Sequence, residues 1–252
     1  MSSRGQTQGL EACGKAPVID VRMTAFDERC PYLKEKTATL EGFFASQIVP
    51  DFYRRLMDVG FRRSGRFLYH TACAGCSECV PIRVLAKAFA PSRSQRRCGS
   101  HNRDLRCTVG EPELTKEKFD LYVAYLRAKH SDSSDHDVGA LYDFLYNPVV
   151  ETREFCYRDD GGRLLAVGIC DVFADALSSV YCYYDVTQMS RGLGTFSAIT
   201  EIEYARQMSL AYYYLGFLVG RCPAMAYKAS YHPYELLEPS CGWVASDVAA
   251  LR

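Results

Sequence analysis

Several signatures of membrane, exported and hydrolytic proteins are missing from this chain of 252 residues. No apolar run approaches the roughly 20 residues that a membrane-spanning helix needs, so we expect no membrane partner. The first twenty residues lack the apolar segment of a signal peptide, and we expect residues 1–20 to be a flexible polar leader of a cytoplasmic protein. The sequence also lacks a Gly-x-Ser-x-Gly elbow, a His-Glu-x-x-His motif and a Walker loop, which argues against common hydrolases and nucleotide-binding enzymes.

The chain also lacks an excess of charge of either sign, because 30 basic side chains balance 30 acidic ones. A balanced chain has no overall attraction for nucleic acid, so any contact with RNA has to come from a local cluster. The most basic stretch, residues 91–106, has no lysine but has five arginines: Arg93, Arg96, Arg97, Arg103 and Arg106. Guanidinium groups fork onto paired phosphate oxygens, whereas many charged runs are simply solvated faces. The sequence leaves both interpretations open.

Cysteine, in contrast, is abundant, with twelve residues. Without an export signal we expect these thiols to stay reduced. Cys73, Cys76 and Cys79 are spaced Cys-x-x-Cys-x-x-Cys, and Cys30 could join them as a fourth thiol. Thiolates at such spacing suit zinc or an iron–sulfur cluster, and the alternative is a set of partly buried thiols without metal.

Hydrophobic periodicity predicts a mixture of helices and strands. We expect helices over 47–60, 116–130 and 192–208, and a short helix or turn over 136–146. We expect strands over 66–70, 80–86, 153–158, 163–173, 177–184 and 211–218, with a hairpin turn at residues 159–162.

The order of these elements indicates an α/β (α+β) fold with a GNAT-like acyltransferase core. In such a core two central strands part, and the acyl donor lies in the gap beside the amide-rich start of a helix. Gly110 and Pro112 mark a joint. We therefore expect an N-terminal lobe over 21–110, with the cysteine loop and the basic segment, and a catalytic lobe over 111–252.

Two further segments could bind ligands. The predicted helix opens on Arg191-Gly192-Leu193-Gly194, whose backbone N–H groups could hold an anion or a carbonyl oxygen. Met189 stands where a coenzyme-A-binding helix has Arg or Gln, which makes coenzyme A a less attractive donor. Residues 225–234 combine tyrosines with one lysine, and they could stack on an adenosine and contact a carboxylate, or could be core tyrosines.

Nine segments between about residues 24 and 240 resemble, in order, the arginyl/leucyl-tRNA–protein transferase family, in its short bacterial branch. The N-terminal ones are Cys30-Pro31-Tyr32-Leu33, Gly60–Gly65, Cys73–Arg83, Phe89–Arg97 and Asn102-x-Asp104-Leu105. The C-terminal ones are Ser179–Asp185, Leu193-Gly194-Thr195, Tyr213–Gly216 and Cys222–Lys228.

The resemblance implies an enzyme with an aminoacyl-tRNA as donor and a protein beginning with Asp or Glu as acceptor. The product enters the N-degron (N-end rule) route to protein degradation. Chain length and the Cys-Pro-Tyr-Leu motif favour leucine rather than arginine as the transferred residue. Eukaryotic relatives have a second cysteine where this chain has Leu33, and their cysteines are linked to an iron–sulfur cluster, so a cluster at Cys30, Cys73, Cys76 and Cys79 is less strongly indicated here.

The chemistry implied by this resemblance assigns roles to particular residues. An aminoacyl ester is already activated, so the reaction itself requires no cofactor. For catalysis we expect Asp185, or a water beside it, as the base, with backbone N–H groups near Tyr184 or Gly194 for the oxyanion. The expected acceptor-binding residues are Arg93, Arg96, Lys228 and Tyr231. The expected tRNA contacts are Arg62, Arg63, Arg97 and Arg103.

Two other functions are compatible with the same residues. One is a coenzyme-A-dependent N-acyltransferase on the same core, and the other is a thiol-rich RNA-binding module with a metal or redox role. The sequence leaves the oligomeric state open.

Overall fold

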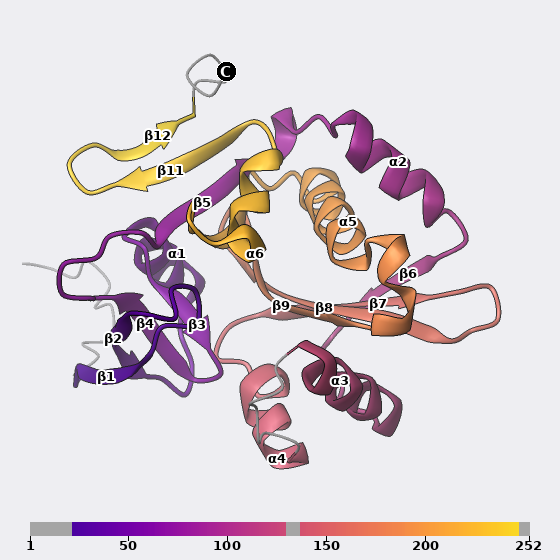
Figure 1. Cartoon of the computed structure of the whole chain (residues 1–252), viewed down its shortest axis with the longest axis horizontal. Coiled ribbons are helices and arrows are strands. Elements are labelled where there is room, and N and C mark those ends of the chain that lie inside the picture. The colour runs from indigo at the N-terminus through magenta and orange to yellow at the C-terminus, as the bar shows by residue number, and fades with distance from the viewer. Residues whose placement is uncertain (1–21, 130–136, 247–252) are drawn as a thin grey trace, which may run out of the picture.

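In a computed structural model, residues 22–129 and 137–246 form a small sheet beside a large sheet with helices on both faces (Figure 1). The expected leader, residues 1–20, lies outside the described residues. Within the described part of the chain, no helix combines the length and apolarity that crossing a bilayer requires.

The small sheet is antiparallel and has the order β1-β2-β4-β3. Its strands are β1 (Thr24–Arg29), β2 (Thr37–Phe44), β3 (Arg62–Ser64) and β4 (Phe67–Thr71). Helix α1 (Pro50–Asp58) connects β2 to β3, buries Tyr53, Leu56 and Met57, and ends before Gly60, whose φ is +89°. The helix predicted over 47–60 is confirmed with shorter bounds, because Pro50 begins it and the left-handed glycine follows its end.

The large sheet has eight strands in the order β12-β11-β5-β10-β9-β8-β7-β6. They are β5 (Val80–Leu85), β6 (Arg106–Gly110), β7 (Thr152–Arg158), β8 (Leu164–Phe173), β9 (Ala176–Tyr184), β10 (Tyr212–Leu218), β11 (Tyr234–Glu238) and β12 (Gly242–Ala245). Strands β5 and β6 precede the expected lobe boundary near residue 110, and both pair with strands that follow it. The large sheet is therefore built from both halves of the chain.

Helices cover the two faces of the large sheet. Helices α2 (Arg93–His101) and α5 (Leu193–Gln207) lie on one face, and α3 (Lys116–Lys129) and α4 (Val138–Leu141) lie on the other (Figure 1). The remaining short helices are η1 (Ala86–Ala88), η2 (Tyr142–Tyr146), η3 (Val186–Arg191), α6 (Pro223–Ala226) and η4 (Tyr227–Ser230).

Strands β9 and β10 form the parallel pair at the centre of the large sheet. They are paired only from Tyr212 opposite Ala176 to Tyr214 opposite Ser178. The pairing of β9 with β10 ends there, and β10 shifts register against its other neighbour, β5, between Tyr214 and Gly216. Helix α5 lies between β9 and β10 in the chain and packs on the sheet, as expected of a right-handed crossover connection. The GNAT-like core predicted from the order of elements is confirmed.

Several elements differ from the prediction. No helix was predicted within residues 91–106, but they contain α2, which begins with a reciprocal capping box between Ser92 and Gln95. Periodicity also misses six strands, and most of their side chains are exposed or only partly buried: β1, β2, β3, β6, β11 and β12. Such strands lack the alternation of apolar and polar residues that identifies a half-buried strand.

A buried ion pair joins the small sheet to the large one. The guanidinium of Arg63 on β3 donates to both carboxylate oxygens of Asp171 on β8, each at 2.7 Å. The hydroxyls of Tyr53 and Thr152 donate to the same carboxylate at 2.8 Å. The side chains of Arg63 and Asp171 are 1% and 0% exposed, so this carboxylate depends entirely on protein donors.

We predict that Arg63→Met lowers the free energy of unfolding by about 3–5 kcal/mol, because it leaves the Asp171 carboxylate buried without its cation. The matched control is Arg153→Met, which removes an exposed ion pair with Glu151 and should cost less than about 1 kcal/mol. Urea unfolding followed by circular dichroism compares the two variants. Similar losses in both would contradict the role of Asp171 as an anchor.

Candidate active site

The parting of β9 and β10 brings two cations together at Gly216. This glycine has a φ of +87°, and it lies at the register shift of β10. A Cβ atom placed on Gly216 would lie 3.2 Å from Lys228 Nζ and 3.7 Å from Arg62 Nη2. Lys228 comes from η4 and Arg62 comes from β3, so the small sheet contributes directly to this gap.

Both cations are buried and contact neutral groups. Arg62 donates to the Ser178 hydroxyl at 3.0 Å and to the Ser179 carbonyl at 2.6 Å. Lys228 Nζ donates to the Phe217 carbonyl at 3.0 Å. Burial lowers the pKa of Lys228 to about 7, and the nearby charge of Arg62 acts in the same direction. The surroundings of Gly216 therefore contain two basic groups whose hydrogen-bond partners are a hydroxyl and two carbonyls, with no carboxylate among them.

The start of α5 presents backbone amides near Tyr184, at the end of β9. Gly192 precedes the helix with a φ of +65°, and no side chain caps the helix there. The first hydrogen bond of the helix runs from the Phe196 N–H to the Gly192 carbonyl. The amides of residues 193–195 therefore have no partner within the helix, and they can stabilise negative charge.

Helix α2 holds this helix start in place. The amide nitrogen of the buried Asn102 donates to the Arg191 carbonyl at 2.8 Å and to the Cys98 carbonyl at 2.9 Å. The Arg191 guanidinium forms a forked ion pair with Asp104 at 2.8 and 2.9 Å. The Asn102-x-Asp104 motif thus fixes the peptide that leads into Gly192.

Two of the three predicted catalytic residues lie together. The ring of Tyr184, at the end of β9, would be 3.6 Å from a Cβ atom on Gly194. Burial raises the pKa of Tyr184, so its phenol is neutral at physiological pH. The same ring packs edge-on against Tyr125, at 5.0 Å between ring centroids. The Tyr184 ring, packed against Tyr125, therefore lies beside the first backbone N–H groups of α5.

Asp185 is not placed as the free base that the sequence suggested. Its carboxylate accepts from the Thr187 N–H at 2.9 Å and from the Thr187 hydroxyl at 2.6 Å, and it pairs with Arg163. These contacts cap η3 and occupy the carboxylate. Asp185 as the base therefore stays a prediction, and in this conformation its carboxylate is bonded within the protein.

The predicted acceptor-binding residues are divided between core and surface. Lys228 is buried in the gap, whereas Arg93 and Arg96 are exposed on α2. Tyr231 is fully buried and stacks near Phe89, at 6.2 Å between ring centroids. Tyr231 therefore packs in the core, and contact with a ligand carboxylate is not available to it in this conformation.

The predicted tRNA contacts are divided in the same way. Arg97 and Arg103 are exposed, as contact with phosphates requires. Arg62 and Arg63 are buried to 8% and 5% exposure, and both are bonded to groups of the large sheet. In this conformation both guanidinium groups are bound within the protein, so the expected contact of Arg62 and Arg63 with tRNA stays a prediction that the burial does not favour.

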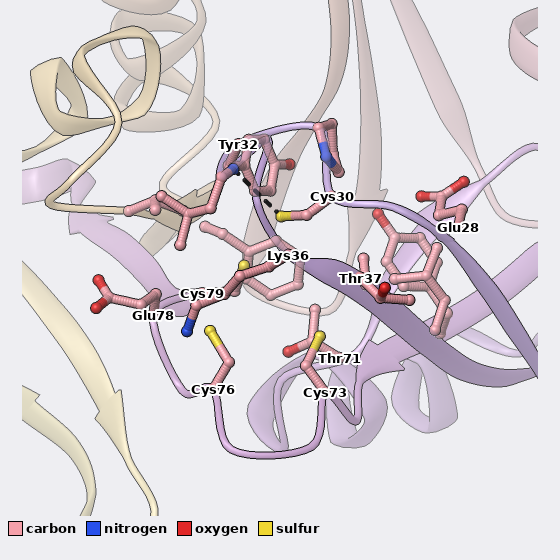
Figure 2. Close-up of a pocket in the computed structure, with 17 residues that line it drawn as sticks. Glu28, Cys30, Tyr32, Lys36, Thr37, Thr71, Cys73, Cys76, Glu78 and Cys79 are labelled. Atoms are coloured by element: carbon pink, nitrogen blue, oxygen red, sulfur yellow. Dashed lines mark hydrogen bonds between the residues drawn. The ribbon is translucent and has the colours of Figure 1, made fainter.

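The four predicted metal-binding thiols line one pocket. Figure 2 shows Cys30, which follows β1, facing Cys73, Cys76 and Cys79 on the loop between β4 and β5. Tyr32, Phe217 and Val219 line the same pocket, which lies close to the end of β10. Folding thus brings Cys30 to the other three, although it is 43 positions from Cys73 in the sequence.

The thiols are not arranged around a common centre. Cys30 Sγ accepts from the Leu33 N–H at 3.3 Å, and Cys73 Sγ accepts from the Thr39 N–H at 3.3 Å. Burial and the neighbouring thiols raise the pKa of Cys79 to about 12. Within the described residues, no three His, Cys, Asp or Glu side chains are placed to hold a metal ion together. The donor chemistry suits a soft metal, whereas the side-chain geometry shown here does not.

Sequence reasoning missed two contributors to the gap. The Ser178 hydroxyl accepts from the Arg62 guanidinium, and Gly216 is the backbone position that both cations approach. Gly216 belongs to the matching segment Tyr213–Gly216, and a glycine inside a strand is a known sign of a bulge or a close approach. The sequence therefore indicated a close approach at Gly216, but it did not indicate that Arg62 and Lys228 are the side chains that approach it.

Comparisons with known proteins agree with this architecture. Family models described as the N terminus and the C terminus of arginine-tRNA-protein transferase match residues 28–97 and 117–238. The aspartate/glutamate leucyltransferase of Teredinibacter turnerae is 36% identical over 225 residues, which cover 88% of this chain and 92% of that protein. The enzyme of the same name from Halorhodospira halophila is 36% identical over 222 residues, covering 86% and 94%.

A solved structure is also similar, namely the C-terminal domain of a lysylphosphatidylglycerol synthetase from Agrobacterium fabrum. It has a TM-score of 0.45 and 16% identity, covering 71% of this chain and 54% of that one. Together the two family models match residues of both sheets. The similarity to the two leucyltransferases covers most of the chain. The chain therefore belongs to the arginine-tRNA-protein transferase family, in the branch of the bacterial aspartate/glutamate leucyltransferases.

Proposed function

We propose that this protein transfers leucine from leucyl-tRNA to the α-amine of proteins that begin with Asp or Glu. The observation that carries the proposal is the similarity, over most of the chain, to enzymes named for this activity. The gap between β9 and β10, beside the uncapped start of α5, supplies a place for the reaction. The N-terminal leucine of the product then directs it to degradation, and the cytoplasm, where charged tRNA is available, is the proposed compartment.

The reaction is an aminolysis of an ester. The nitrogen lone pair of the acceptor attacks the carbonyl carbon of the leucyl ester, and a C–N bond forms. The tetrahedral intermediate collapses, the bond from that carbon to the ribose oxygen breaks, and the free hydroxyl of the tRNA is the leaving group. One proton leaves the nitrogen and one proton reaches the ribose oxygen, so no redox partner or cofactor enters the balance.

The protein contributes mainly position and electrostatics. Free N–H groups of residues 193–195 can stabilise the oxyanion, since they are fixed before the reaction begins. The Tyr184 ring closes one side of that position. Holding the amine in line with the ester carbonyl can supply about 7–11 kcal/mol of the barrier.

The amine can lose its proton to solvent before the attack. An α-amino group has a pKa of roughly 8, so about a tenth of it is neutral at pH 7. Because the Asp185 carboxylate is occupied by Thr187 and Arg163, the proposal assigns it no proton transfer. This differs from the expectation based on the sequence.

The exposed arginines of α2 and the turn after it are the proposed contacts to tRNA phosphates. Arg97 and Arg103 are exposed, and the same segment is tied to the start of α5 through Asn102 and Asp104. The element that would bind the tRNA therefore also positions the helix that would receive its ester. The coenzyme-A alternative has less support, because Met189 breaks the expected motif and the relatives are named for leucyl transfer.

The central prediction is transfer of labelled leucine from leucyl-tRNA to peptides beginning with Asp or Glu, with little transfer to a matched peptide beginning with Ala. Arginyl-tRNA should be a poor donor in the same assay. Acetyl-coenzyme A should neither be consumed nor shift the melting temperature. If the protein leaves both charged tRNAs intact in the presence of these peptides, the proposal is wrong.

The double variant Arg97→Ala/Arg103→Ala should weaken transfer to every acceptor peptide to a similar extent, because it acts on the shared donor. The slope of log KM for leucyl-tRNA against log salt should fall by roughly 0.7–0.9 for each phosphate that the variant no longer neutralises. The matched control is Arg127→Ala, another exposed arginine, on α3. An unchanged slope in the double variant would show that the tRNA binds elsewhere.

The thiol pocket remains the candidate for a soft metal, with Cys30, Cys73, Cys76 and Cys79 as ligands after side-chain rotation. A metal at this pocket predicts zinc or iron in the purified protein and its loss in the double variant Cys76→Ser/Cys79→Ser, whereas the alternative of packed thiols predicts no metal in either. Elemental analysis measures both. Cys241→Ser, at an exposed cysteine outside the pocket, is the control. Metal-free wild-type protein with full activity would leave the pocket as a set of packed thiols.

A further inference from the structure

We propose that the buried pair Arg62 and Lys228 binds the acidic side chain of the acceptor's first residue, and that the exposed arginines of α2 do not. The inference rests on the proposed function and names the groups that give it specificity for Asp and Glu.

The first argument is that the two cations approach the same glycine of β10. Both a Lys228 Nζ atom and an Arg62 Nη2 atom lie within 3.7 Å of the place where a Gly216 side chain would begin. Because position 216 has a φ of +87°, any other residue would be strained there, and glycine lets both cations approach the backbone of β10. A carboxylate placed between the two side chains could accept from both.

The second argument is the missing counter-charge. Within the described residues, neither Arg62 nor Lys228 has a carboxylate within 4.0 Å, and their bonded partners are a hydroxyl and carbonyls. The neighbouring buried arginines differ, since Arg63 pairs with Asp171 and Arg83 pairs with Asp58 and Glu235. Two adjacent buried cations repel each other, and an incoming anion would relieve that repulsion.

The third argument is selectivity. A carboxylate held between two desolvated cations is distinguished from an amide of the same shape, because replacing it removes a charge as well as a hydrogen-bond acceptor. Arg93 and Arg96 on α2 are surrounded by water, which screens such a difference. The surroundings of the pair are also confined, with the Tyr32 and Tyr69 phenols close to Arg62. This favours a small side-chain carboxylate over a phosphodiester with two sugars attached.

The test measures kcat/KM for three peptides that differ only in a first residue of Asp, Asn or Ala, with leucyl-tRNA at saturation. We expect Lys228→Met to lower the value for the Asp peptide about 10–100-fold, as for loss of one charged hydrogen bond, and to leave the Asn peptide unchanged. Lys228→Arg, which keeps the charge, should retain most of the preference. The pair Arg93→Ala/Arg96→Ala should leave the Asp-to-Asn ratio as in the wild type.

A measurement on the wild-type protein avoids any effect of substitution on folding. N-acetyl-aspartyl amide has the carboxylate but no free amine, and it should inhibit in competition with the Asp peptide and not with leucyl-tRNA. N-acetyl-asparaginyl amide is the matched control and should inhibit at least tenfold less. Competition with leucyl-tRNA would show that the pair binds a phosphate, and would overturn the proposal.

The outcomes separate this inference from the proposed function. Wild-type protein that transfers nothing contradicts the function itself. Wild-type protein that transfers leucine, together with a Lys228→Met variant that loses Asp and Asn peptides equally, contradicts only the assignment of the pair. Loss of the Asp-to-Asn ratio in Arg93→Ala/Arg96→Ala would move the acid-binding site to α2.

Discussion

The contact between Arg63 and Asp171 determines where the small sheet sits, and the reaction site depends on that placement. A carboxylate buried at 0% exposure needs its cation, and here it also receives two hydroxyl donors, from Tyr53 and Thr152. Side chains of consecutive strand residues point to opposite sides. Once Arg63 is bound to β8, its neighbour Arg62 is directed to Ser178 and Ser179 on β9. One residue thus anchors the sheet, and the next enters the gap.

The gap itself results from a short parallel pairing. Strands β9 and β10 are in register over three positions only, and the shift at Gly216 turns the end of β10 away. Helix α5 begins near this opening, with its first amides free, and the Tyr184 ring lies against Gly194. The amides suit a developing oxyanion, whereas the buried cations suit a fixed negative charge. The amides belong to α5, whereas the cations belong to β3 and η4. The proposed aminoacyl donor and protein acceptor can therefore be held by different elements.

Much of the core was predictable from the sequence, and the pairing of charges was not. The long strands β7, β8 and β9 and the helices α3 and α5 follow apolar patterns, so their existence and approximate bounds are confirmed. Helix α2 was missed because its only buried side chain is Gln95, which leaves no apolar stripe, although the Ser92–Gln95 capping box was present in the sequence. Arg62 and Arg63 appeared to be surface residues, since the Asp171 that binds Arg63 is 108 positions away. Asp185 could have been identified as a cap from Thr187 two positions later.

Helix α2 buries only the Gln95 side chain, which is why it was not predicted. For the same reason, its exposed residues contribute little to the stability of the fold. A helix that is started by a local capping box and joined to its neighbours through Gln95, Asn102 and Asp104 owes little of its stability to its outer face. Residues on that face can therefore change in charge and length without weakening the core. If tRNA binds this face, as proposed, its selectivity can change during evolution while the architecture beneath stays the same.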